Sequence, residues 1–327
     1  MGVDVRPTST AQAAVCMRGI VGALTPGGRT LAPVQLDTLC AIAQELWACD
    51  LDPADVEPAG PEEVAAALPE HWRRRRLIQL MVTLELLLHP LPREVSREVA
   101  RYARALGVDE PTVGAARHLA AHQTALMYAC IQRNNWYPAQ TRREIRHGDM
   151  AEVVRSKMAY YGLGQDQALA AKWRALGDRP EGSWGRGVFE FYGANGFPFP
   201  GEPHGIYEVG ARHDWVHVLT DYGTSPEGEI DVFAYIAAAM PDPQGFVLLV
   251  VTLGIFQNGS IRHMYGRRVP NTTTDALDTD RGPWRFADAL RRGEACTVDV
   301  LGLDHFSLAS EPLDAVRARF NVLPRGG

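Results

Sequence analysis

His213 and His217 are the residues of this chain whose types and spacing are best suited to chemistry. Residues at positions i and i+4 of a helix lie on one face, so both imidazoles can bind the same cation. Asp214 lies beside them in the sequence, and Glu229 follows after a short turn. Two imidazoles with one or two carboxylates form a ligand set that suits zinc, iron, manganese or cobalt. The pattern therefore predicts a site for a divalent metal.

Two helices must position these side chains. We expect the first helix from about 205 to 222, with both histidines on an inward face that also contains apolar residues. Thr224 or Ser225 can cap the second helix, which has Pro226 in its first turn. Glu229 then lies one turn inside the second helix, where its carboxylate can point back across the turn at the histidines.

The role of Asp214 is less constrained than that of the two histidines. Adjacent helical residues diverge by about 100°, so Asp214 either completes the ligand set or orients a ligand histidine. His118 and His122 offer an internal comparison, because they have the same spacing on an expected helix without an acidic residue in the following turns. We interpret this second pair as structural.

The periodicity of the apolar residues predicts an all-α fold with two helical domains. Helical patterns fill residues 35–133, with one continuous helix expected from about 111 to 133. The expected organisation is a flexible lead-in over 1–34, a helical domain over 35–133, a linker over 134–149 and a second helical domain over 150–327.

Composition excludes several classes of protein. With 33 basic and 39 acidic side chains the formal net charge is −6, so no general attraction for nucleic acid is expected. The five cysteines show no C-x-x-C spacing, which argues against a disulfide framework and against a cysteine zinc site. The longest apolar run, Phe246–Phe256, has 11 residues, whereas a membrane-spanning helix has about 20. We expect this run to form a buried helix rather than a strand.

The same features indicate a cytoplasmic protein. The sparse cysteines fit reduced thiols, and the N-terminal segment lacks the pattern of a signal peptide. The run Arg73–Arg76 precedes a strongly apolar helix and can contact anionic lipid, which leaves a peripheral position on the inner face of a membrane open. A solvated helix entrance is the competing interpretation of this run.

The second half resembles a known family. The pattern H-D-x-x-H, eleven residues and then Glu, from His213 to Glu229, is the signature of the ubiquinone-biosynthesis family called coenzyme Q biosynthesis protein 4. Upstream, 181–185 and 188–192 resemble that family's "LP-x-G-T-x-G … Y-x-F" segment, and 312–322 resembles its closing "PL-x-x-V-R" helix. The resemblance covers about 150–327, with a long insert around 271–297.

The resemblance implies an all-α fold, a hydrophobic cavity for a polyprenyl tail and a role at C1 of the quinone head-group precursor. It also implies a divalent metal, usually taken as zinc, held by the matching residues His213, Asp214, His217 and Glu229. The family is linked to oxidative decarboxylation, and it has also been described as a scaffold for other biosynthetic enzymes.

The first half resembles the TerB-like helical domains named for tellurite resistance. The segments that carry this likeness are 61–68, 77–88 and 102–110. Some members of that family bind metal through acidic loop residues, with which Asp50, Asp52 and Asp55 can be compared. A solvated acidic loop is the ordinary explanation of these three residues, and we expect no metal there.

The leading hypothesis is a metal-dependent enzyme that decarboxylates a prenylated hydroxybenzoate-type aromatic acid, with oxidation, in quinone biosynthesis. One alternative is a non-catalytic scaffold that binds a prenyl lipid, has a structural metal and organises biosynthetic enzymes. Another is a metal-dependent enzyme of a specialised aromatic metabolite. The expected partners are therefore a prenylated aromatic molecule or an isoprenoid lipid, with other biosynthetic enzymes or a second copy of the chain as protein partners.

Overall fold

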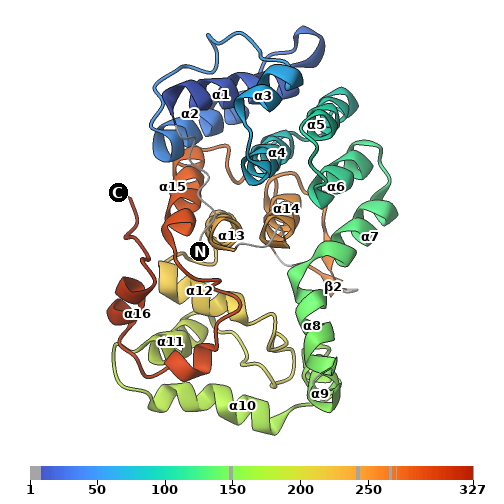
Figure 1. Cartoon of the computed structure of the whole chain (residues 1–327). Coiled ribbons are helices and arrows are strands. Elements are labelled where there is room, and N and C mark those ends of the chain that lie inside the picture. The colour runs from blue at the N-terminus through green and yellow to red at the C-terminus, as the bar shows by residue number, and fades with distance from the viewer. Residues whose placement is uncertain (1–8, 147–149, 241–243, 265–266, 270, 327) are drawn as a thin grey trace.

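The computed structural model describes residues 9–146, 150–240, 244–264, 267–269 and 271–326. Over these residues the chain is all-α except for a hairpin of two short antiparallel strands, β1 (His263–Met264) and β2 (Arg267–Arg268). The predicted all-α fold class is thus confirmed. Helices α1 to α6 form an upper layer, α13 and α14 lie in the centre, and α10 to α12 lie below them (Figure 1).

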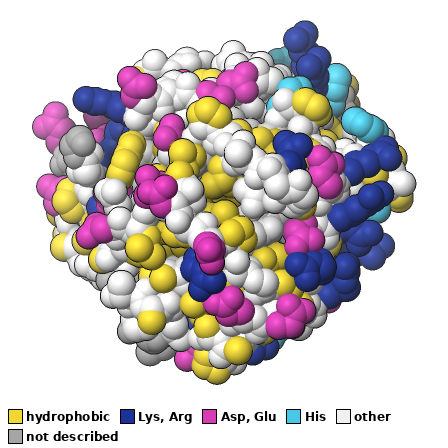
Figure 2. All heavy atoms as spheres, turned by 90° about the horizontal axis from the view of Figure 1, so that it is seen from above, with side chains coloured by type: hydrophobic (Ala, Val, Ile, Leu, Met, Phe, Trp, Pro, Cys, Tyr) yellow, Lys and Arg dark blue, Asp and Glu magenta, His cyan; other side chains and the backbone are white. Residues whose placement is uncertain are grey.

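The first half of the chain forms eight helices within the described residues. Their bounds are α1 (Thr10–Leu24), α2 (Pro33–Trp47), α3 (Pro61–Ala67), α4 (His71–Glu85), α5 (Arg93–Ala105), α6 (Pro111–Ala120), α7 (Thr124–Asn134) and α8 (Trp136–Arg146). A short 3-10 turn, η1 (Pro26–Gly28), follows α1. Seen from above, basic side chains gather along the edge where α5, α6 and α7 lie (Figure 2).

The second half adds eight more helices in the described ranges. Their bounds are α9 (Met150–Tyr160), α10 (Gln167–Arg174), α11 (Trp184–Asn195), α12 (Arg212–Thr220), α13 (Pro226–Ala239), α14 (Gln244–Phe256), α15 (Gly282–Ala295) and α16 (Leu313–Arg319). Two 3-10 turns, η2 (Ala175–Asp178) and η3 (His305–Leu308), complete this half. The described part contains no helix with the length and apolarity that crossing a membrane requires.

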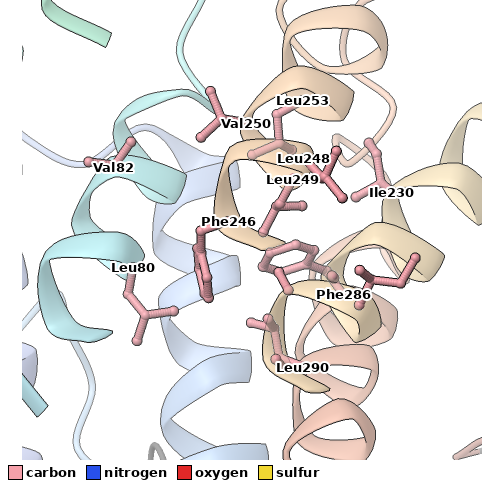
Figure 3. Close-up of a cluster of buried hydrophobic side chains, with 14 of the residues drawn as sticks. Leu80, Val82, Ile230, Phe246, Leu248, Leu249, Val250, Leu253, Phe286 and Leu290 are labelled. Atoms are coloured by element: carbon pink, nitrogen blue, oxygen red, sulfur yellow. The ribbon is translucent and has the colours of Figure 1, made fainter. Parts of the chain in front are cut away.

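The centre of the core is formed by α14. Its residues are apolar on every face, and a helix of this kind is stable only when other elements surround it. Phe246 and Leu249 point toward α4, α13 and α15, where Leu80 and Phe286 meet them (Figure 3). Burying each of these side chains contributes about 1.5–3 kcal/mol. The prediction of a buried helix over this run is confirmed.

One hydrophobic core joins the two halves of the chain. Helix α15 packs along α2, and α14 contacts α4, α6, α7 and α8. At the edge of the first contact, Arg291 of α15 forms an ion pair with Glu45 of α2 at 3.1 Å. The boundary between two domains at 134–149 stays a prediction, and the helices on either side of it pack together.

The expected lead-in over 1–34 is wrong for the residues that the structure describes from Ser9 onward. Ser9 caps α1 by accepting a hydrogen bond from the amide of Gln12, and α1 is buried against α3, α4 and α5. Two of the glycines that suggested a loose segment, Gly19 and Gly22, are places of close approach, whereas Gly27 and Gly28 lie in a turn with open space around them. A Cβ at Gly19 would lie 2.7 Å from Cγ2 of Val64. The small residues therefore allow helix packing rather than flexibility.

The expected linker over 134–149 is also largely helical. Asn135 is fully buried, its side-chain oxygen accepts a hydrogen bond from the amide of Tyr137 at the start of α8, and α8 continues to Arg146. Residues 147–149 lie outside the described residues. The polar composition that suggested a hinge belongs to the outer face of this helix, where Arg142 and Arg143 are exposed.

Candidate metal centre

Helices α12 and α13 hold the four predicted ligands. The expected helix over 205–222 is shorter than predicted, because α12 begins at Arg212 after a series of turns. It ends before Asp221, whose backbone is left-handed with φ 62°. Ser225 caps α13 by accepting from the amide of Gly228 at 3.2 Å, which selects Ser225 between the two predicted caps. Glu229 then lies in the first turn of α13, as predicted.

Both histidines use Nδ1 to contact a backbone carbonyl. The distance is 2.6 Å from Nδ1 of His213 to the oxygen of Gly210, and 3.0 Å from Nδ1 of His217 to the oxygen of Tyr222. A carbonyl oxygen only accepts hydrogen bonds, so each Nδ1 carries the proton. Each neutral ring therefore has its lone pair on Nε2. This is how proteins fix the tautomer and orientation of metal-binding histidines.

Each Nε2 faces a carboxylate. Nε2 of His213 lies 3.2 Å from Oδ1 of Asp214, and Nε2 of His217 lies 3.4 Å from Oε1 of Glu229. One ligand atom from each of His213, Asp214 and His217 can be chosen so that all lie within 4.8 Å of one another. The structure thus brings the two predicted histidines together with Asp214 and places Glu229 beside them from the next helix.

Tyr192 holds the second oxygen of Asp214. Its hydroxyl donates to Oδ2 of Asp214 at 2.5 Å, and both side chains are buried. Burial raises the pKa of Asp214, while His213 and the bond from Tyr192 act to lower it. Burial and the neighbouring Asp214 raise the pKa of Tyr192 well above its usual value, so the hydroxyl stays a donor. Asp214 can therefore offer Oδ1 as a ligand while Oδ2 is fixed by Tyr192.

His217 and Glu229 form an electrostatically coupled pair. Burial opposes a charge on His217, but the facing carboxylate of Glu229 outweighs it and raises the pKa of His217. Burial likewise acts to raise the pKa of Glu229, and the neighbouring His217 outweighs that effect and lowers it. A positive charge located between Nε2 of His217 and the carboxylate of Glu229 is therefore stabilised. A divalent cation supplies such a charge.

Aromatic rings enclose the two imidazoles. Phe191 of α11 stacks on His217 with ring centroids 5.4 Å apart, and Phe233 of α13 stacks on His213 at 5.5 Å. The side chain of His217 is 1% exposed, whereas those of His213 and Glu229 are 14% and 18% exposed. His217 is therefore enclosed, whereas His213 and Glu229 are partly exposed.

Three arginines from the last part of the chain bind the carbonyl end of α12. Arg317 donates to the oxygens of Leu219 and Val218 at 2.9 and 3.2 Å. The oxygen of Thr220 accepts from Arg292 at 3.0 Å, and that of Asp221 from Arg325 at 2.8 Å. The final carbonyls of a helix lack partners within the helix, and cations at this end also stabilise its dipole. These contacts fix the helix that carries both histidines.

The residues present fit a divalent metal ion. Nε2 of His217 is buried and has no hydrogen-bond partner among the described residues, although it lies near the carboxylate of Glu229. An unpaired buried nitrogen is unfavourable unless a ligand satisfies it. Two neutral imidazoles and two carboxylates match the donors preferred by zinc, iron, manganese and cobalt. Within the described ranges, His213, Asp214 and His217 form a metal-compatible group.

The other sequence candidates do not assemble into sites. His118 and His122 do not share a helix face, because α6 ends at Ala120 and His122 has a left-handed backbone with φ 58°. The expected continuous helix over 111–133 is therefore divided into α6 and α7. Asp50, Asp52 and Asp55 are exposed in a loop, in keeping with their interpretation as a solvated acidic segment.

The Arg73–Arg76 run is largely structural rather than a lipid contact. Arg74 donates to the carbonyls of Leu68, Ala65 and Leu106. Arg76 is buried, its guanidinium lies over the ring of Phe246, and burial lowers its pKa to about 10. Neither a solvated helix entrance nor a membrane contact describes these two side chains.

Sequence reasoning missed the residues that orient the ligands. Tyr192 lies in a segment already singled out by its pattern, but its contact with Asp214 spans 22 residues. Arg317 binds the carbonyl of Leu219, which is 98 residues away in the sequence. No local sequence pattern predicts such a contact. Compared with known proteins, the chain matches no protein-family model and no curated protein.

Proposed function

We propose that this protein binds one divalent metal ion and decarboxylates a prenylated hydroxybenzoate-type aromatic acid in quinone biosynthesis. The proposed metal ligands are His213, Asp214, His217 and Glu229. The observation that carries the proposal is the contact of both Nδ1 atoms with backbone carbonyls, which leaves both Nε2 atoms facing carboxylates. The choice of reaction and substrate is supported by the resemblance of 150–327 to the ubiquinone-biosynthesis family. Zinc is the first candidate, with iron, manganese and cobalt as alternatives.

The accessible side of the site favours an enzyme. Structural zinc sites are normally closed by four protein ligands, whereas catalytic sites leave a position for substrate, so catalysis requires that Asp214 orient a histidine rather than bind the ion, or that the ion accept a fifth ligand. Here His213 and Glu229 are partly exposed, so a substrate oxygen would have to approach the ion from their side. When bound, the ion supplies Lewis-acid stabilisation to a carboxylate or phenolate oxygen. Phe191 and Phe233 exclude water from the imidazole faces, and Tyr192 keeps Asp214 in place.

Two adjoining clefts, one of which reaches the first residue of α12, suit an aromatic acid. One has a volume of about 320 Å³ and a lining rich in tyrosines, which includes Tyr137, Tyr160, Tyr161 and Tyr207 together with Arg142 and Lys157. The second, of about 300 Å³, shares Thr141, Lys157 and Tyr207 with the first and reaches Arg212, the first residue of α12. Its lining also contains Glu144, Glu152 and Glu208, and Arg212 is paired with Glu144 at 3.3 Å, so the cations free to bind a carboxylate are Arg142 and Lys157 of the first cleft. Cationic side chains bind a carboxylate, and tyrosine rings pack against aromatic and isoprenoid groups. We assign the substrate's ring and the start of its prenyl chain to these clefts.

The scaffold alternative is favoured by an exposed apolar stripe on and just after α9. It consists of Met150, Val154, Met158, Tyr161 and Leu163, each at least 43% exposed. Exposed arginines of α8 are near in sequence, and the combination suits the surface of an anionic membrane. A Val154→Glu variant is expected to lose binding to anionic vesicles, with Leu51→Glu, which alters an exposed leucine elsewhere, as the control.

The experiment that tests the proposal is turnover of a prenylated hydroxybenzoate by metal-loaded protein, with product formation and carbon dioxide release followed by mass spectrometry. We expect carboxyl loss in the wild type and in His118→Ala, and none in His217→Ala. Because replacement of the carboxyl by a hydroxyl requires an oxidant, the assay is run with and without dioxygen. Tightly bound prenyl lipid with no turnover under either condition would favour the scaffold. Turnover of unprenylated aromatic acids alone would favour the specialised-metabolite alternative.

A further inference from the structure

A cleft of about 300 Å³ lies between α5 and α6, in the half of the molecule away from the candidate metal centre. Three arginines, Arg93, Arg97 and Arg117, line it together with Ser96, His118, Gln123 and small residues. The volume is at the lower end of the range for small-molecule sites. The cleft plays no part in the proposed function.

The cleft has an uncompensated positive charge. The nearest acidic residues of α5 are engaged elsewhere, because Glu94 pairs with Arg29 at 3.0 Å and Glu98 pairs with Arg101 at 2.6 Å. Arg97 and Arg117 form no ion pair with any residue that the structure describes. The basic edge in Figure 2 lies on this side of the molecule. Arginines that line one cleft without a carboxylate among the lining residues favour an anionic ligand.

A buried hydroxyl in the same lining also lacks a partner. Ser96 is 1% exposed, and its Oγ has no hydrogen-bond partner within the described part of the chain. Buried polar groups are normally hydrogen-bonded, so an orphaned donor in a cleft wall points to a ligand that accepts from it. Ser96 and Arg97 are neighbours in α5, and both residues line the cleft. An anion that accepts from the serine must therefore contact the cleft wall beside Arg97.

The walls of the cleft are held in place by contacts of their own. Arg93 donates to the carbonyls of Ala120 and Ala121 at 3.1 and 3.5 Å and so ties α5 to the end of α6. Nδ1 of His118 lies 2.8 Å from the side-chain oxygen of Gln123, which orients the imidazole. Arg93 and His118 are thus positioned by contacts within the cleft wall, whereas the exposed side chains of Arg97 and Arg117 would be ordered by the ligand.

We propose that the α5–α6 cleft binds a phosphate group, whose oxygens accept from the guanidinium groups of Arg97 and Arg117 and from the hydroxyl of Ser96. A phosphate fits this set better than a carboxylate, because it carries up to two charges and enough oxygens for two guanidinium groups and a hydroxyl. The phosphate belongs either to a small free molecule or to a lipid headgroup. In both cases the group that the cleft recognises is the same phosphate.

The test is calorimetric titration of the full-length chain with inorganic phosphate and glycerol phosphate in chloride buffer. A parallel arm uses vesicles of phosphatidylcholine with and without phosphatidic acid. We expect affinity to fall about tenfold or more in Arg97→Gln and in Arg117→Gln, because each loses a charge-assisted contact. A smaller loss is expected in Ser96→Ala. Arg104→Gln is the matched control, since Arg104 is an exposed arginine of α5 outside the cleft lining.

The outcomes separate the two sources. Binding of the soluble phosphates that depends on Arg97 and Arg117 supports a site for a free phosphorylated molecule. Binding only to vesicles with phosphatidic acid, with the same dependence, supports a lipid headgroup. No binding in any arm, or equal affinity in the two cleft variants and Arg104→Gln, overturns the proposal. Both arginines are exposed, and a thermal melt of each variant confirms that it is folded.

Discussion

The hydroxyl of Tyr192 donates to Oδ2 of Asp214 at 2.5 Å, in a place where both side chains are buried. This contact connects α11 to α12 and leaves Oδ1 of Asp214 beside Nε2 of His213. The arrangement resembles the outer contacts that orient metal ligands in many proteins. It gives Asp214 a fixed position in the site.

Replacing Tyr192 with phenylalanine removes this hydrogen bond and keeps the ring. We expect Tyr192→Phe to weaken metal affinity about 10–100-fold, because Asp214 loses the donor that orients it. A competition titration with a chromogenic chelator measures the change. Unaltered affinity in a folded variant would show that Tyr192 has no part in the metal site.

Arg317 is expected to stabilise α12 through the two carbonyls it binds. Arg317→Ala should lower the free energy of unfolding by about 1–3 kcal/mol, because the carbonyls of Val218 and Leu219 lose a charged donor. Arg319→Ala is the control, since that arginine forms an exposed ion pair with Glu311, which is worth about 1 kcal/mol or less. Urea unfolding of both variants makes the comparison. Equal losses would contradict the assigned role of Arg317.

His305 gives the protein a predictable sensitivity to acid. Burial, with a contribution from the charge of Arg212, lowers the pKa of His305 from 6.5 to about 3. Between these values the unfolded chain binds a proton that the folded chain does not, so stability falls as the pH falls through this window. In this window the free energy of unfolding falls by about 1.4 kcal/mol for each unit by which the pH falls.

The variant His305→Phe should lose that slope while it keeps a ring against Trp184 and Trp215. The free energy of unfolding, measured with urea at pH 6 and pH 5, is expected to fall less in the variant than in the wild type. The variant also loses the contact of Nε2 with the carbonyl of Val300. This loss changes the free energy of unfolding by a similar amount at pH 6 and at pH 5. Parallel pH profiles would mean that His305 is charged in the folded protein.

Leu249 tests whether the two halves unfold together. It is fully buried in the centre of α14, and Leu249→Ala should cost about 2–5 kcal/mol through lost burial and a cavity. Because α14 packs against helices of both halves, we expect one cooperative transition at a lower denaturant concentration. Circular dichroism and tryptophan fluorescence should then coincide. Two separated transitions would support independent domains.

The parts of the fold that the sequence could predict are those with local signals. The apolar run of α14 predicts a buried helix, and Ser225 with Pro226 predicts the start of α13. The spacing of His213 and His217 places both imidazoles on one face of α12. Each of these signals lies within one or two helical turns, where geometry follows directly from residue order.

The parts that could not be predicted depend on distant contacts. Gly19 suggests a flexible lead-in until Val64 is placed against it, and then it marks close packing. His118 and His122 have helical spacing, but α6 ends between them. The positions of Tyr192 and Arg317 around α12 depend on how the whole chain folds, and no pattern in their own neighbourhoods reveals their partners.

The central claim is a metal ion at the four proposed ligands, and elemental analysis of protein purified without chelators tests it most directly. Wild type and His118→Ala should each contain one tightly bound divalent metal per chain, and His217→Ala and Glu229→Gln should lose it. Native mass spectrometry and a thermal melt confirm that each variant is folded. Stoichiometric metal in His217→Ala, or none in the wild type, would contradict the account.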